Sequence, residues 1–112
     1  MGIYLGRYWR DATDGYFSYL MDPDGVTDTS LRVTYFGNDA AVNDMDRAFD
    51  ILIDDQLLTG VTLTGGQGDV FVDVNYQIPG NLIGDGSPVR VKFQSHTNAI
   101  AGGVYGVRLI RN

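Results

Sequence analysis

The 112-residue sequence is short of cysteine, proline and basic side chains, with no cysteine, three prolines and 8 Lys and Arg against 14 Asp and Glu. The lack of cysteine excludes disulfide bonds, thiolate nucleophiles and cysteine-based zinc sites. The formal charge of −6 argues against nucleic acid as a partner, because nucleic-acid binders present a basic face. It argues equally against anionic membrane surfaces. The composition excludes these partners without naming a function.

Long hydrophobic runs are also missing. No apolar stretch approaches the roughly 20 residues of a transmembrane helix. Residues 1–7 have neither the basic region nor the apolar region of a secretory leader, so we expect no signal peptide in this chain. The length fits one domain, and the sequence shows no internal repeat and no linker. We therefore expect a single domain over residues 1–112.

The abundant features indicate an all-β chain. Fifteen glycines and seven tyrosines favour strands joined by many turns. In 89–95, for example, Val89, Val91 and Phe93 alternate with polar residues, which is typical of a strand with one buried face. Such patterns predict strands at 3–9, 16–21, 31–36, 48–54, 57–64, 70–77, 89–95 and 104–110. Only residues 40–47 could hold a helical turn.

About eight short strands at this spacing predict an antiparallel β-sandwich of jelly-roll type. If successive strands run in opposite directions, alternate connections emerge at the same end of the sandwich. One end, which we call the loop end, then collects the connections 10–15, 37–47, 65–69 and 96–103. These connections carry the more ligand-recognising side chains, and binding residues concentrate on loops held by a rigid scaffold. We therefore expect the binding site at the loop end.

Eight residues are the candidates for carbohydrate binding: Trp9, Arg10, Asp11, Tyr16, Asn38, Asp39, Asn98 and Tyr105. An aromatic face such as Trp9 or Tyr105 can stack on a sugar ring, while Arg, Asn and Asp side chains hydrogen-bond its hydroxyl groups. Structural alternatives stay open for each. Trp9 can cap the core, Arg10 can pair with a carboxylate, and the Asn and Asp residues of 38–46 can bond their own backbone.

Two acidic segments leave calcium open as an alternative, although we expect no cofactor and name no metal ligand. Residues 22–28 carry a D-x-D-G pattern, but they lack the distal Glu of an EF-hand and flanking helices. Residues 38–46 are dense in oxygen atoms of the kind that calcium prefers. Solvated acidic turns explain both segments as well.

The sequence offers no catalytic residues. His96 is the single histidine and follows Ser95 directly, and neighbours on a strand point to opposite faces rather than into one triad. No G-x-S-x-G motif is present, and the glycines of 65–68 lack the lysine and helix of a phosphate-binding loop. A close carboxylate pair, as in glycosidases, is uninformative among 14 acidic residues. We therefore do not expect an enzyme.

Several segments, taken in order, resemble a known family. They are Trp9–Ala12 followed by Gly15–Tyr19, then Leu31–Gly37, Arg47–Asp54, Val89–Gln94 and Ala101–Arg108. Together they resemble the β-sandwich accessory domain at the C-terminal side of bacterial β-L-arabinofuranosidase-type glycoside hydrolases. More distantly, they resemble malectin-like and jelly-roll carbohydrate-binding modules. The resemblance covers residues 8–110, with a longer 38–47 loop and with Asp55 where the hairpin would favour glycine.

The resemblance implies a non-catalytic module of a polysaccharide-degrading enzyme that is secreted or periplasmic in the parent protein. Its partners would be a polysaccharide or oligosaccharide and a catalytic glycoside hydrolase domain. A second interpretation is a docking domain that packs on a catalytic domain or a dimer mate and binds no sugar. Trp9, Tyr16 and residues 101–105 would then form the interface, and the isolated domain would expose an apolar patch.

Overall fold

The structure is a computed structural model that describes residues 2–4, 7–42 and 44–112, with side chains from residue 10 onward. Within these residues the chain forms ten strands and one short helix. They are β1 (Gly2–Tyr4), β2 (Arg7–Thr13), β3 (Tyr16–Met21), β4 (Thr29–Phe36), β5 (Arg47–Ile53), β6 (Gln56–Leu63), β7 (Phe71–Gln77), α1 (Gly80–Ile83), β8 (Val89–Ser95), β9 (Ile100–Val104) and β10 (Gly106–Arg111). In the described part of the chain, no helix has the length and apolar character needed to cross a bilayer.

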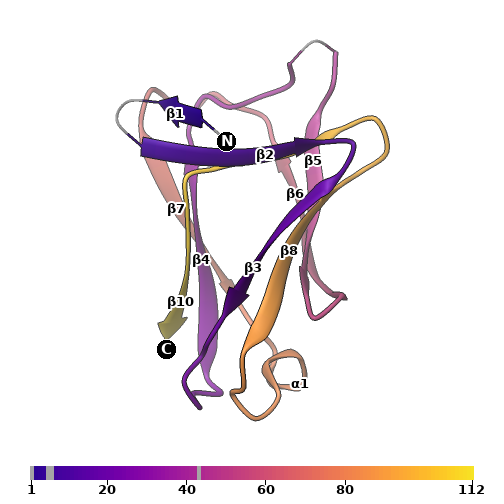
Figure 1. The fold of residues 1–112 in the computed structure, drawn as a ribbon. Coiled ribbons are helices and arrows are strands. Elements are labelled where there is room, and N and C mark those ends of the chain that lie inside the picture. Colours follow the sequence, from indigo (N-terminus) through magenta and orange to yellow (C-terminus); the bar gives the residue numbers. More distant parts are fainter. Residues whose placement is uncertain (1, 5–6, 43) are drawn as a thin grey trace.

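The strands pack as an antiparallel sandwich, which confirms the predicted fold class. One sheet has the order β3-β8-β5-β6, and the sheet β10-β4-β7 faces it (Figure 1). A smaller sheet, β1-β2-β9, crosses one end of the sandwich (Figure 1). Between β3 and β8 the chain changes sheets at every connection except the β5–β6 hairpin. This crossing between two layers brings alternate connections to one end.

The core is built from the inward positions of the alternating strands. Leu31 and Val33 of β4 are fully buried, as are Phe49 and Ile51 of β5 and Phe93 of β8. Each such side chain contributes roughly 1.5–3 kcal/mol when it leaves water. A slip of one residue in strand register would turn all of them toward solvent, so the alternation also fixes the register. This core therefore holds in place the strands from which the connections of the loop end emerge.

Two predicted strands are wrong at their boundaries. The strand expected at 3–9 corresponds to β1 and β2, with residues 5 and 6 outside the described residues. The strand expected at 104–110 corresponds to β10, which begins at Gly106, while Val104 ends the separate strand β9. Arg10 and Asp11 therefore lie in β2, where Arg10 pairs with Val104, rather than in a loop. The reason is a long-range pairing of β2 with β9, which local sequence patterns do not report.

Gly102 shows why this pairing needs glycine. Its φ of +99° belongs to a region that residues with a Cβ rarely adopt, and a Cβ there would lie 2.7 Å from the carbonyl oxygen of Arg10. The ladder between β2 and β9 also shifts register between Arg10 and Asp11. Gly102 thus allows the backbones of β2 and β9 to approach closely within the small sheet.

Residues 40–47, the one segment that could hold a helical turn by its sequence, form none at the described positions. The described residues of this segment include an isolated antiparallel bridge between Val42 and Met45. The short helix is α1 instead, and its buried Ile83 anchors it to the core. Pro79 directly precedes α1 with a φ of −55°, and proline at a helix start leaves no N–H unpaired.

Candidate functional site at the loop end

The four connections predicted to share one end do lie together (Figure 1). The backbone hydrogen bonds that tie them are Gly37 N to Val70 O at 2.7 Å, Asp14 N to Ala99 O at 2.9 Å and Ile100 N to Asp46 O at 2.8 Å. Each bond joins segments far apart in the sequence. The predicted position of these connections is therefore confirmed.

Three side chains pack around Gly103, which is itself buried in β9. A Cβ atom on Gly103 would lie 3.5 Å from Oδ2 of Asp39, 3.7 Å from Cε1 of Tyr105 and 3.9 Å from Nη1 of Arg47. We call Asp39, Arg47 and Tyr105 the Gly103 cluster. It combines a carboxylate, a guanidinium and an aromatic ring at the end of the sandwich where the sequence predicted a binding site.

Arg47 holds the Asp39 loop against β9. Its Nε donates a hydrogen bond to the carbonyl of Ala40 at 2.8 Å, and its Nη1 donates to the carbonyl of Gly102 at 3.0 Å. A guanidinium has five N–H donors, so two bonds to the backbone still leave donors that can face a ligand. Arg47 therefore fixes the geometry of the cluster and supplies its positive charge.

Asp39 is a half-buried carboxylate whose pKa lies above its ordinary value of 3.8. Burial is the largest cause, because loss of water disfavours the charged form. The nearby charge of Arg47 lowers the pKa in part, while the carboxylate of Asp11 raises it further. A carboxyl group of this kind in a hollow is a common feature of binding sites.

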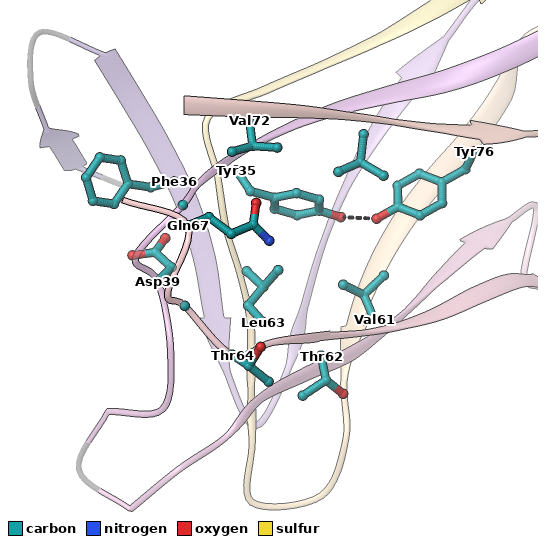
Figure 2. Close-up of a pocket in the computed structure, with 13 residues that line it drawn as sticks. Tyr35, Phe36, Asp39, Val61, Thr62, Leu63, Thr64, Gln67, Val72 and Tyr76 are labelled. Carbon is teal, nitrogen blue, oxygen red and sulfur yellow. Dashed lines mark hydrogen bonds between the residues drawn. The ribbon is translucent and has the colours of Figure 1, made fainter. Parts of the chain in front are cut away.

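A pocket of about 210 Å³ opens beside the Gly103 cluster, between β6 and β7. We call it the edge pocket. Asp39 and Gln67 both belong to the lining of this pocket and lie at the same end of it (Figure 2). Farther along the pocket, the hydroxyls of Tyr35 and Tyr76 are 2.9 Å apart and hydrogen-bonded to each other (Figure 2). The pocket and the cluster therefore share Asp39.

Asn38, another predicted binding residue, ties two connections together. Its Oδ1 accepts a hydrogen bond from the N–H of Gly68 at 3.0 Å, and its Nδ2 donates to Asp69. Both ends of the amide thus hold the 64–70 connection against the 37–46 connection. These bonds give Asn38 a structural role, and sugar binding by it stays a prediction.

Arg10 and Tyr16 lie apart from the cluster. The guanidinium carbon of Arg10 lies 5.5 Å from the ring centre of Phe17 and 5.3 Å from that of Tyr19. Arg10 therefore covers the aromatic side of the core, where cation–π attraction holds it. Tyr16 is 61% exposed, and the Nζ of Lys92 lies 4.8 Å from its ring centre.

Asn98 and Trp9 complete the predicted set. Asn98 lies in the exposed turn between β8 and β9, with a φ of +57°, and its N–H donates to Oδ1 of Asp14 at 3.1 Å. The backbone of Trp9 pairs with Gly2 in the small sheet, while its side chain lies outside what the structure describes. Of the eight predicted residues, the structure brings Asp39 and Tyr105 together around Gly103, and the carboxylate of Asp11 lies near enough to Asp39 to raise its pKa.

Comparison with known proteins places the chain in a family. The family of unknown function DUF6805 matches residues 1–110. The chain belongs to this family. No curated protein matches the DUF6805 chain.

A similar solved structure is a family 35 carbohydrate-binding module from an environmental isolate. The TM-score is 0.66 at 14% sequence identity, and the alignment covers 97% of the DUF6805 chain and 77% of the other chain. At this identity the likeness shows the fold alone. Neither comparison supports the narrower resemblance to the arabinofuranosidase accessory domain, which therefore stays a prediction.

The acidic segments of the DUF6805 chain are built as turns. Asp24 has a φ of +55°, and its N–H bonds to Oδ1 of Asp22 at 2.8 Å, as in an Asx turn. Across the described ranges, no three His, Asp or Glu side chains are grouped closely enough to hold a metal ion. Asn43, in the second acidic segment, lies outside the described residues.

The sequence interpretation missed Arg47, Gln67 and the tyrosine pair Tyr35–Tyr76. Arg47 ends the acidic 37–47 connection. A single cation after five aspartate and asparagine residues could have indicated that its side chain interacts with this connection. The tyrosines gave no such signal, because each occupies an ordinary inward position of a strand. Only the three-dimensional pairing of β4 with β7 brings their hydroxyls together.

Proposed function

We propose that this domain is a non-catalytic carbohydrate-binding module that holds a glycan at its loop end. The observation that carries the proposal is the grouping of Asp39, Arg47 and Tyr105 around Gly103. Carboxylates and guanidinium groups hydrogen-bond sugar hydroxyls, and an aromatic ring offers a stacking face. The similarity in fold to a family 35 carbohydrate-binding module supports the proposal.

Tyr105 is the aromatic platform in this proposal. Its ring packs at 5.0 Å from the ring centre of Phe71 and at 6.3 Å from that of Phe36. A ring that is already held in place loses little freedom when a ligand binds, which lowers the entropic cost of binding. Affinity should still be weak, because a sugar exchanges bonds to water for similar bonds to protein.

The narrower context is also part of the proposal. The resemblance of residues 8–110 supports an accessory domain of a polysaccharide-degrading glycoside hydrolase of the β-L-arabinofuranosidase type, secreted or periplasmic in its parent protein. Its partners would be a polysaccharide or oligosaccharide and a catalytic domain. The carboxylates of the loop end would then bind hydroxyl groups rather than cleave a glycosidic bond.

The test is a glycan array followed by isothermal titration with the strongest glycan. We expect Asp39→Asn to weaken binding about tenfold, because the charged acceptor for a sugar hydroxyl is lost. Asp44→Asn is the matched control, because this substitution removes the same charge from the same connection at an exposed position. Equal affinity of both variants would contradict the site, and silence on the array would contradict the function.

Calcium enters the same experiment as a separate arm. Titration is repeated with a chelator and with calcium in excess of the weak extracellular range of about 10⁻⁴–10⁻³ M. We expect equal affinities in both arms, because the proposed contacts are made by side chains alone. Binding only with calcium would instead direct mutagenesis to Asp22, Asp24, Asp39 and Asp44.

Docking on another domain is the second candidate, and exposed apolar side chains favour it. Leu20 of β3 and Leu57 of β6 are 67% and 61% exposed on the outer face of the four-stranded sheet. The interface expected at 101–105 is not available as such, because residues 101–104 are buried in β9. The exposed leucines make the outer face of this sheet the candidate docking surface.

A further inference from the structure

The edge pocket lies where the sandwich is open at its side. β6 is the last strand of the four-stranded sheet and β7 is the last strand of the facing sheet, so the described strands leave this side uncovered. Val61 and Leu63 of β6 point toward the tyrosine pair, and Val72 of β7 lies on the opposite wall (Figure 2). The pocket therefore has apolar walls from two different sheets.

The tyrosine pair gives the pocket an inner hydrogen-bonding group. Tyr35 is 4% exposed, and its hydroxyl and that of Tyr76 share one hydrogen bond of 2.9 Å. Burial raises the pKa of both phenols, so each keeps its proton at neutral pH. Two O–H groups share a single bond, and among the described residues neither hydroxyl has another partner. One O–H donor and several lone pairs are therefore available to a ligand.

The end of the pocket nearest the loop end carries different polar groups. The amide of Gln67 and the carboxylate of Asp39 lie there (Figure 2). Apolar walls with a few fixed polar groups at both ends are the usual composition of a small-molecule site. The arrangement suits a ring whose faces are apolar and whose rim carries hydroxyl groups.

The volume and the charge of the edge pocket restrict the class of ligand that it can bind. The volume of about 210 Å³ lies below the roughly 300–1,000 Å³ of typical ligand pockets, so it fits one ring and not a stretch of chain. Asp39 is the one charged residue of the lining in the described chain. A carboxylated sugar would bring a second negative charge toward this half-buried carboxylate.

We infer that the edge pocket binds one uncharged sugar residue at the end of a glycan chain, with the hydroxyls of Tyr35 and Tyr76 as its inner anchor. The inference rests on the proposed function, because it names the part of the glycan that is recognised. Chain ends project a single ring, and the Gly103 cluster beside the pocket then contacts the next unit. The domain thereby distinguishes neutral chain ends from uronic acids.

The test is an NMR titration of the ¹⁵N-labelled domain with small probes. The neutral probes are the methyl glycosides of galactose, xylose and arabinose, and the charged probe is galacturonic acid. We expect at least one neutral probe to shift the amide signals of residues 61–65 and 72–76. Galacturonic acid should bind at least about tenfold more weakly, since like charges in a half-buried site repel.

Two variants separate binding from folding. Tyr76→Phe removes one hydroxyl of the pair and should weaken binding of the neutral probe about tenfold. Val61→Phe fills the pocket from its wall and should abolish binding. Val70→Phe is the matched control, because Val70 is 53% exposed and outside the pocket lining, and it should bind as the wild type does. Thermal melting of each variant confirms that it is folded.

The outcomes distinguish this inference from the proposed function. If polysaccharide binds and Asp39→Asn weakens it, while no probe shifts the pocket amides, the inference is wrong and the proposed function stands. If galacturonic acid binds as well as the neutral probes, the charge argument is wrong. If neither probes nor polysaccharides bind, the proposed function fails as well.

Discussion

Asp39 occupies a position that lowers the stability of the folded chain at neutral pH. Its pKa is raised above 3.8 mainly by burial, so the folded state binds the proton more tightly than the unfolded state does. The contribution of this group to stability is therefore fully present below pH 3.8 and is lost as the pH rises through the raised pKa. A residue that costs stability where it stands is more readily explained by function than by packing.

This argument gives a prediction for Asp39→Asn. Asparagine has the same shape without the charge, so the variant should be at least as stable as the wild type near neutral pH. The advantage should shrink as the pH falls through the raised pKa of Asp39, and it should be gone below pH 3.8, where Asp39 is protonated in the folded and the unfolded state. Urea unfolding of both proteins across this range measures the difference. A variant that is less stable at neutral pH, with the gap closing in acid, would show that the Arg47 charge outweighs burial.

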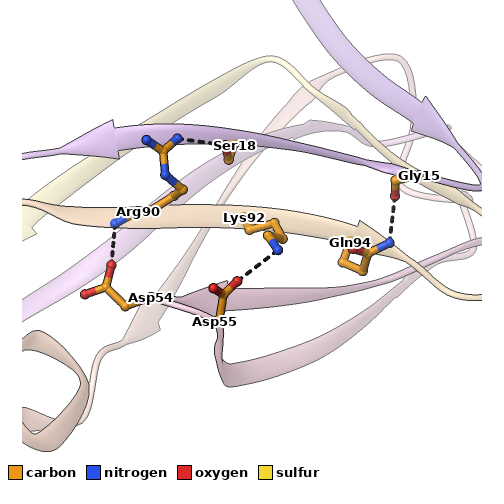
Figure 3. A network of polar contacts seen from close by, with 7 residues as sticks. All are labelled: Gly15, Ser18, Asp54, Asp55, Arg90, Lys92 and Gln94. Carbon is orange, nitrogen blue, oxygen red and sulfur yellow. Dashed lines mark hydrogen bonds and ion pairs between the residues drawn. The ribbon is translucent and has the colours of Figure 1, made fainter.

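The β5–β6 hairpin shows how one element is fixed by its turn. Asp54 and Asp55 connect the strands with φ values of +49° and +67°, the conformation of a two-residue type I′ turn. Aspartate tolerates this region better than most residues, which accounts for a hairpin without the glycine that the sequence pattern favours. The turn is then secured from β8, because the N–H of Arg90 donates to Oδ1 of Asp54 at 2.8 Å (Figure 3).

Charged neighbours on β8 complete this outer surface. Lys92 pairs with Asp55 at 2.9 Å, which lowers the pKa of Asp55, and Arg90 donates to Oγ of Ser18 at 3.0 Å (Figure 3). Ion pairs this exposed contribute little to stability. The hydrogen bond from the backbone to Asp54 is therefore the contact that matters most for the hairpin.

Replacing Asp54 tests this view of the hairpin. Asp54→Ala should lower the free energy of unfolding by roughly 1–2 kcal/mol, because it removes the acceptor for the Arg90 N–H and places alanine at positive φ. Asp54→Asn keeps both an oxygen acceptor and tolerance of positive φ, so it should unfold close to the wild type. Chemical denaturation of the three proteins provides the comparison, and equal losses in both variants would assign the effect to charge instead.

The elements also show which parts of the fold the sequence can predict. β3 and β8 have the predicted boundaries because their alternating residues have one buried and one exposed face along their whole length. β9 was missed because its five residues are all buried and its two glycines resemble a turn. Its place is decided by pairing with β2, whose residues lie more than 80 positions earlier in the chain in every pair. Local patterning carries no information about such a partner.

At the scale of the whole molecule, the predicted strand order correctly placed four connections at one end of the sandwich. The residue types alone did not predict how the side chains at that end are arranged. The alternating direction of the strands was sufficient to place these connections. Strand direction depends on the order of the strands along the chain and is little affected by an error of one or two residues at a strand end. The grouping of Asp39 with Tyr105 around Gly103 depends on loop conformation, as does the use of Asn38 as a clamp between connections. These features follow from long-range contacts, so the sequence could name the residues but not their arrangement.

The two candidate functions use opposite parts of the molecule, so they can be separated by substitutions. Leu20 lies near the end of β3 and Leu57 near the β5–β6 turn, both far along the sandwich from the loop end (Figure 1). The double variant Leu20→Asp, Leu57→Asp should unfold within about 1 kcal/mol of the wild type, because exposed positions tolerate change. The double variant should keep its affinity for glycan, whereas Asp39→Asn should bind glycan about tenfold more weakly. The docking interpretation predicts a different result. The leucine variant would then lose self-association or binding to the parent catalytic domain, and Asp39→Asn would keep both this association and its affinity for glycan.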